Sequence, residues 1–99
     1  MTLAAMLVAC GGASAPDVHV AFASIQVDEA RIEHASVALE RADDDTTRRT
    51  QGEEVCAASA HLCDTARPLD DRDASARCAR AEERCARATD ESAPRTTAP

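Results

Sequence analysis

The chain has 99 residues and a formal net charge of −7, with 18 acidic residues against 11 arginines and no lysine. A negative charge of this size disfavours binding to nucleic acids and to anionic membrane surfaces. A chain of this length supports one small domain or part of one. Phe22 is its single Phe, Tyr or Trp residue, and domains this poor in apolar bulk usually depend on disulfides, metal or oligomerisation.

The N-terminal segment, residues 1–9, is apolar and ends directly before Cys10. The run Leu7-Val8-Ala9-Cys10 resembles the lipobox of bacterial lipoproteins. This resemblance implies that a signal peptidase cuts before Cys10 and that the thiol of Cys10 carries a diacylglycerol. Acyl chains of this kind anchor a protein to a membrane without a transmembrane helix.

Two further expectations concern this segment. In lipoproteins an aspartate directly after the cysteine favours retention at the inner membrane, and here Gly11 stands at that position, so the resemblance points to the outer membrane, facing the periplasm. The alternative is that residues 1–9 form a buried helix in which Cys10 is incidental.

Residues 10–21 are rich in Gly, Ser, Ala and Pro at their start, which predicts a flexible tether. Residues 22–45 are then predicted to contain one amphipathic helix that ends near Ala42, because Ile25, Ile32 and Leu39 recur every seven residues on one face. The charged residues of this helix are expected to lie largely off that face; they are Asp28, Arg31, Glu33, Glu40 and Arg41. The apolar stripe must either fold onto the rest of the chain or meet another molecule, including a second copy.

Residues 46–52 are polar and contain weak helix formers, so they could be a linker or a helical connection. The four remaining cysteines follow in the pattern C-x6-C-x14-C-x6-C; they are Cys56, Cys63, Cys78 and Cys85. Seven helical steps separate the members of each C-x6-C pair by roughly 10 Å, whereas a disulfide needs Cα atoms about 4.4–6.8 Å apart. Neither pair can therefore close within one helix, and each of two helices should carry two cysteines.

Two of the three possible connectivities remain, and the turn decides between them. Pro68 should end the first helix, and Asp70, Asp71 and Asp73 should supply the cap and first-turn acids of the second, which places the turn at about residues 66–70. A short turn makes the helices antiparallel, and antiparallel helices require nested pairing. Residues 53–90 are therefore predicted to be a helical hairpin stapled by Cys56–Cys85 and Cys63–Cys78, followed by a disordered tail at residues 91–99. The fold class is all-α.

The twin spacing resembles the disulfide-stapled helical hairpins of twin-cysteine mitochondrial proteins and of plant hairpin peptides. Those families also carry two cysteines on each antiparallel helix, but with nine and three intervening residues instead of six. The Cys/Ala/Arg-rich hairpin is also similar to segments of small uncharacterised envelope lipoproteins of GC-rich bacteria. These resemblances imply a fold and a location, and no activity.

Several kinds of chemical site are disfavoured by spacing. Cysteines seven residues apart on a helix cannot chelate one zinc ion, no C-x-x-C redox motif occurs, and His61 is expected to be a solvent-facing helix residue. The arginines at 77, 80, 84 and 87 are expected to form a solvated face balanced by nearby acids, with the pairs Asp73–Arg77 and Glu83–Arg87, and not an anion-binding site.

We therefore expect a membrane-anchored, non-enzymatic envelope lipoprotein without a cofactor, a metal or a nucleic-acid partner. It would act as a structural or protein-binding module, with Ile25, Ile32 and Leu39 as one surface for a partner or for self-association. Two alternatives remain. The chain could be a secreted effector or inhibitor with an ordinary signal segment, or a cytosolic metal-binding or redox protein with free thiols.

Overall fold

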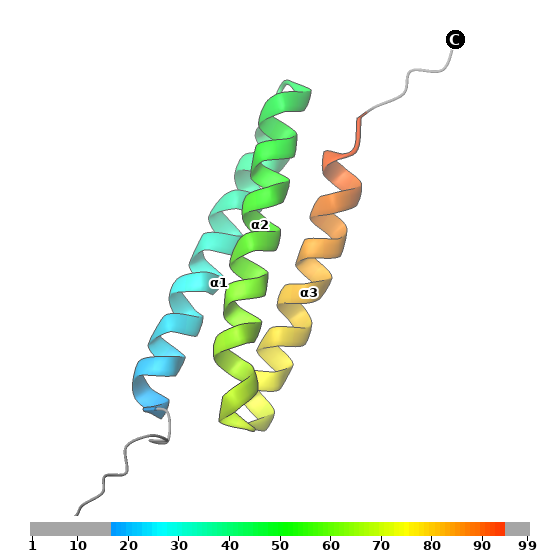
Figure 1. Cartoon of the computed structure of the whole chain (residues 1–99). Coiled ribbons are helices and arrows are strands. Elements are labelled where there is room, and N and C mark those ends of the chain that lie inside the picture. The colour runs from blue at the N-terminus through cyan, green and yellow to red at the C-terminus, as the bar shows by residue number, and fades with distance from the viewer. Residues whose placement is uncertain (1–16, 95–99) are drawn as a thin grey trace, which may run out of the picture.

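The structure is a computed structural model that describes residues 17–94. It contains three α-helices, α1 (Val18–Arg41), α2 (Asp45–Ala66) and α3 (Arg72–Ser92), and one short 3-10 helix, η1 (Arg67–Leu69). The predicted all-α fold is confirmed, with one helix preceding an antiparallel hairpin. Figure 1 shows α2 between α1 and α3, and α2 packs along the length of both, whereas α1 and α3 touch much less.

An aspartate precedes each of the three helices and caps it. Asp17, Asp44 and Asp71 each accept a hydrogen bond from a backbone N–H two or three residues further along the chain. These bonds satisfy N–H groups of the first turn that have no partner within the helix. The sequence around each helix start therefore fixes where the helix begins.

One helix boundary differs from the prediction, and one alternative that the sequence left open is decided. The first helix begins at Val18 because Asp17 caps it, so residues 18–21 belong to the helix and not to the tether. The polar residues 46–52 are the beginning of α2, which Asp44 starts by accepting from the backbone N–H of Thr47 at 2.7 Å. Of the two readings of this segment, the helical connection is the one observed. The helix preceding it accordingly ends at Arg41.

The turn between α2 and α3 lies where it was predicted. Pro68 stands within η1, and Asp70 follows in the left-handed region with φ 48°. Aspartate tolerates this conformation better than most residues because its short polar side chain can hydrogen-bond locally. Asp71 then caps α3, and Asp73 is the acid of its first turn.

The core is one seam, formed by residues three, four and seven apart on α1 and α2 and by residues seven apart on α3. α1 contributes the stripe of Ile25, Ile32 and Leu39, each at most 3% exposed, and α3 contributes alanines. The buried cluster consists of Ile25, Ile32, Ala35, Leu39, Val55, Ala58, Leu62, Ala66, Ala74, Ala81 and Ala88. The stripe thus folds onto the hairpin and makes a three-helix bundle. Ile25, Ile32 and Leu39 are therefore buried, and they do not form a surface for a partner or for self-association.

The two nested disulfides are confirmed. Cys56–Cys85 and Cys63–Cys78 join α2 to α3 with Cα atoms 4.6 and 4.8 Å apart. Such short distances require small side chains between the helices, which the alanines of α3 provide. Gly52 allows an equally close approach of α2 and α3 at the end of the hairpin away from the turn, because a Cβ atom built there would lie 2.9 Å from the Cβ of Ser92.

Some predicted features lie outside the described residues. Cys10 and the lipobox-like segment precede residue 17, and most of the predicted tail follows residue 94. α3 continues to Ser92, so residues 91 and 92, which were predicted to be disordered, are helical. Of the helices described, none has the length and apolar character that would be needed to cross a membrane.

Candidate functional site

A charged groove runs between α1 and α3 on the side of the bundle away from α2. The groove has a volume of about 320 Å³, and its floor includes the buried side chains of Ile32 and Ala81. Four arginines of α3 line it, together with three glutamates; these are Arg77, Arg80, Arg84, Arg87, Glu29, Glu33 and Glu83. The groove exists because α1 and α3 both pack on α2 while making little contact with each other.

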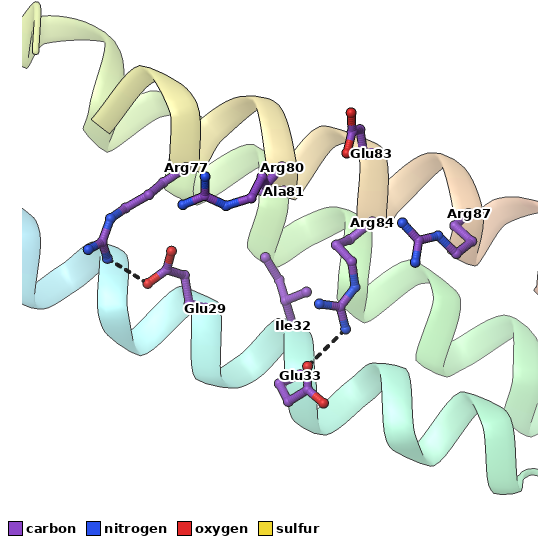
Figure 2. A pocket seen from close by; sticks show the side chains of 9 residues that line it. All are labelled: Glu29, Ile32, Glu33, Arg77, Arg80, Ala81, Glu83, Arg84 and Arg87. Atoms are coloured by element: carbon purple, nitrogen blue, oxygen red, sulfur yellow. Dashed lines mark hydrogen bonds and ion pairs between the residues drawn. The ribbon is translucent and has the colours of Figure 1, made fainter. Parts of the chain in front are cut away.

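Two of the arginines reach across the groove to α1. Arg77 donates to Glu29 at 2.8 Å, and Arg84 donates to Glu33 at 3.0 Å, as Figure 2 shows. Arg77 also lies over the ring of Phe22, with its guanidinium carbon 5.6 Å from the ring centre. These contacts join α1 to the stapled hairpin along the rim of the groove.

The other two arginines lack such partners. Among residues 17–94, neither Arg80 nor Arg87 has a carboxylate oxygen within ion-pair distance, although both line the groove. Figure 2 shows the Glu83 carboxylate directed away from Glu33 and no contact from it to Arg87. Because Glu29 and Glu33 are already paired with Arg77 and Arg84, the positive charge of the groove is concentrated on Arg80 and Arg87.

This arrangement corrects part of the expected charge pattern. The pair Asp73–Arg77 is present at 3.2 Å, but Glu83–Arg87 is not formed. Arg77 and Arg84 are largely covered, with side chains 23% and 33% exposed, because α1 packs beside them. Arg77 and Arg84 therefore belong to the contact with α1, whereas Arg80 and Arg87 are exposed, as expected for a solvated face.

A second polar cluster lies between α1 and α2, away from the groove. Asp28 is only 2% exposed, and its Oδ2 lies 2.6 Å from Nδ1 of His61. Its other oxygen accepts from Arg31 at 3.2 Å, and Arg31 in turn donates to Glu54 on α2 at 3.0 Å. The hydrogen bond that Arg31 donates to Glu54 is the main cause that raises the pKa of Arg31. The cluster thus fastens α1 to α2 through a buried carboxylate.

The burial of Asp28 differs from the prediction, although the spacing of this residue carries the signal. Asp28 lies three residues after Ile25 and four before Ile32, so it occupies a seam position. His61 was expected to face solvent, and its side chain is indeed 59% exposed. Its ring nitrogen nevertheless bonds to Asp28, which amphipathic spacing along a single helix could not indicate.

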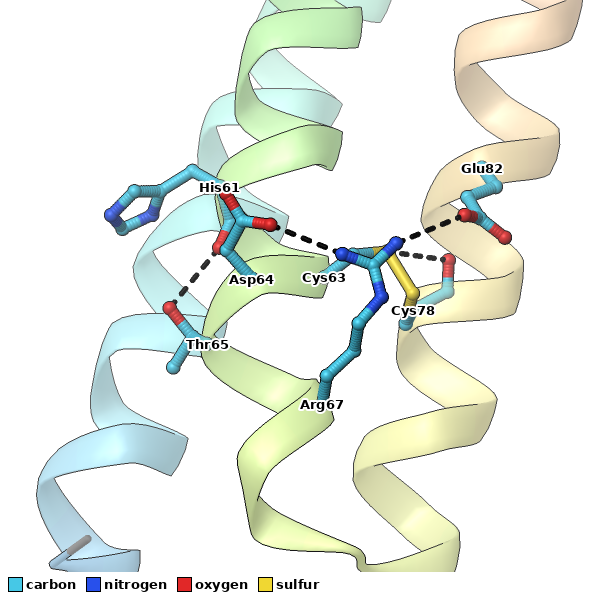
Figure 3. The surroundings of a disulfide bond; sticks show 7 residues. All are labelled: His61, Cys63, Asp64, Thr65, Arg67, Cys78 and Glu82. Atoms are coloured by element: carbon cyan, nitrogen blue, oxygen red, sulfur yellow. Dashed lines mark hydrogen bonds and ion pairs between the residues drawn. A yellow bond between two sulfur atoms is a disulfide. The ribbon is translucent and has the colours of Figure 1, made fainter. Parts of the chain in front are cut away.

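The surroundings of the inner disulfide contain a group of potential metal ligands. Sulfurs of Cys63 and Cys78 and a carboxylate oxygen of Glu82 lie within 4.8 Å of one another. The two sulfurs are bonded to each other, so neither is the thiolate that a metal needs. Figure 3 shows Arg67 over this bond, between Asp64 at 3.1 Å and Glu82 at 3.8 Å, with His61 directed away from it. With the Cys63–Cys78 disulfide intact, these residues lie beside the turn between α2 and α3, and the two sulfurs cannot bind a metal ion.

The chain was compared with protein families, with curated proteins and with solved structures, and none of the three comparisons gives a match.

Proposed function

We propose that this chain is a non-enzymatic lipoprotein of the bacterial cell envelope that acts as a protein-binding module. A lipid on Cys10 would anchor it, and the three-helix bundle would present its contact surface to a partner. The proposal combines the lipobox-like run before Cys10 with the properties of residues 17–94.

The observation that carries this proposal is the pair of nested disulfides. Disulfides form and persist in oxidising compartments such as the periplasm and the cell surface, and are rare in the cytosol. All four cysteines of the hairpin are used in this way. A protein with both a lipobox-like cysteine and two disulfides fits the envelope better than the cytosol, which disfavours the metal-binding or redox alternative.

The bundle also has features of a binding module. Two covalent bonds and the interhelical ion pairs hold the helices together, so a surface on them is largely preformed. A preformed surface loses less conformational entropy when a partner binds. The groove between α1 and α3 is such a surface.

Metabolic labelling tests the anchor. The full chain would be expressed in a bacterium that lipidates proteins, with a radioactive or clickable fatty acid, beside the variant Cys10→Ala. We expect label on the wild-type chain, which should sediment with membranes, and no label on Cys10→Ala. An unlabelled wild-type chain that is recovered as soluble protein would reject the anchor, and release into the medium without Cys10 would favour a secreted effector or inhibitor.

A further inference from the structure

We infer that the groove between α1 and α3 binds one amphipathic helix of a partner protein, whose acidic side chains pair with Arg80 and Arg87. This inference rests on the proposed binding function and names the chemistry of the partner. It starts from the incomplete packing of the bundle. α2 is covered by both other helices, whereas α1 and α3 leave between them a groove of about 320 Å³.

The shape of the groove favours a helix as its occupant. It follows two helices that run side by side, and a helix laid along it would complete a four-helix arrangement around Ile32 and Ala81. Helices commonly bind in this way, with residues three, four and seven apart directed into the groove. The apolar floor predicts a small or aliphatic side chain at the centre of the bound helix.

The charge of the groove sets the chemistry of that helix. Arg80 and Arg87 stand two turns apart on α3, which corresponds to roughly 10 Å. Carboxylates seven residues apart on the partner helix would have the same spacing. A guanidinium donates to a carboxylate through two parallel hydrogen bonds, so each arginine can hold one acid with defined geometry.

The overall charge argues against other anionic partners. The chain carries a net charge of −7, which repels extended polyanions such as nucleic acid and the flat surface of an anionic bilayer. A single helix inside the groove would be close to the four arginines and would meet only three glutamates, two of them already paired. The local charge therefore favours an acidic peptide segment.

A designed peptide tests the inference on the purified, oxidised full chain. The probe is a fluorescein-labelled, alanine-based helical peptide with two glutamates seven residues apart and one leucine between them. A second peptide carries glutamine in place of both glutamates. Fluorescence anisotropy would compare wild type with Arg80→Gln/Arg87→Gln and with the control Arg49→Gln/Arg72→Gln, which removes the same charge from exposed positions outside the groove.

We expect the acidic peptide to bind wild type, and Arg80→Gln/Arg87→Gln to weaken binding by about tenfold or more. The glutamine peptide should show a similar loss, and the control variant should stay within about twofold of wild type. Absence of binding, or equal losses in both variants, would overturn the inference. Binding to phosphatidylglycerol vesicles that depends on Arg80 and Arg87, without binding of the peptide, would overturn it in favour of a lipid ligand. Fatty-acid labelling at Cys10 is measured separately, so the anchor and the groove can fail independently.

Discussion

Asp28 puts a carboxylate into the seam between α1 and α2, where most neighbours are apolar. The charge is tolerated because His61 and Arg31 both lie within hydrogen-bond distance of its oxygens. Breaking a buried ion pair from one side is more damaging than replacing the whole group, because the remaining charge stays buried without compensation. Asp28 should therefore depend strongly on its two partners.

Removal of both partners tests this dependence. We expect Arg31→Gln with His61→Gln to lower the free energy of unfolding by about 3 kcal/mol, measured by denaturant titration of the oxidised chain. Adding Asp28→Leu to that double variant should recover most of the loss, since an apolar side chain fits the seam. A triple variant that is no more stable than the double variant would contradict this account of Asp28.

Asp44 shows how one side chain determines a helix start. Its carboxylate accepts from the backbone N–H and the hydroxyl of Thr47, at 2.7 and 2.9 Å, and these bonds lower the pKa of Asp44 below its ordinary value of 3.8. A lowered pKa in the folded chain means that the ionised form stabilises the fold. That contribution is complete above pH 3.8 and is lost as the pH falls through the lower, folded-state value.

The variant Asp44→Asn tests whether the ionised form of Asp44 stabilises the fold. Asparagine is also a good N-cap, so the helix start should persist while the charge is removed. We expect the wild type to lose more stability than Asp44→Asn when the pH is lowered from about 5 to 2. An NMR titration of the Asp44 carboxyl should give a midpoint below 3.8, and a midpoint above that value would contradict the observed cap.

α1 contains both a feature that its sequence predicts and one that it does not. The apolar stripe of α1 was predictable because Ile25, Ile32 and Leu39 repeat with the period of a helix. Asp28 lies in the seam and not off it as predicted, because His61, 33 positions further along the chain, compensates its carboxylate. Local periodicity contains no information on such a pairing.

At the scale of elements, the nested disulfides hold α2 against α3. The inner bond closes a separation of 15 residues and the outer one a separation of 29. When the inner bond is present, the shortest path from Cys56 to Cys85 passes through it, so the outer bond closes a loop about as long as the inner one. By the chain-entropy account, removing either bond alone should therefore cost about 3 kcal/mol.

Paired substitutions measure this contribution. Cys63→Ala/Cys78→Ala and Cys56→Ala/Cys85→Ala should lower the free energy of unfolding by similar amounts, about 3 kcal/mol each, and the fourfold variant by roughly twice as much. Denaturant unfolding followed by circular dichroism would give the values. A fourfold variant as stable as wild type would show that packing alone holds the hairpin together.

The connectivity of these bonds followed from helix geometry, since the rise per residue forbids bonds within a helix and the Pro68 turn forbids parallel helices. The beginning of α2 did not follow in the same way. Gly52 and the weak helix formers of residues 46–52 left both a linker and a helix open. Tertiary packing decided for the helix, because Gly52 lies buried against the end of α3.

At the scale of the whole molecule, the bundle is closed by α2 on one side and open along the α1–α3 groove on the other. Alanines make α3 pack closely on α2, and its Arg77 and Arg84 extend to glutamates of α1. One helix thus combines a core face with a charged face. The sequence indicated both faces, but the groove depends on how α1 sits against the hairpin, which no spacing within one helix defines.

The central claim is that a lipid anchor on Cys10 and a doubly stapled bundle belong to one mature envelope protein. Intact-mass spectrometry of the native protein from bacterial membranes tests both parts together. We expect a chain that begins at Cys10, carries acyl chains, and is lighter by two hydrogens for each of the disulfides Cys56–Cys85 and Cys63–Cys78. A mass that corresponds to an unlipidated chain in which the four hairpin cysteines are free thiols would contradict both parts.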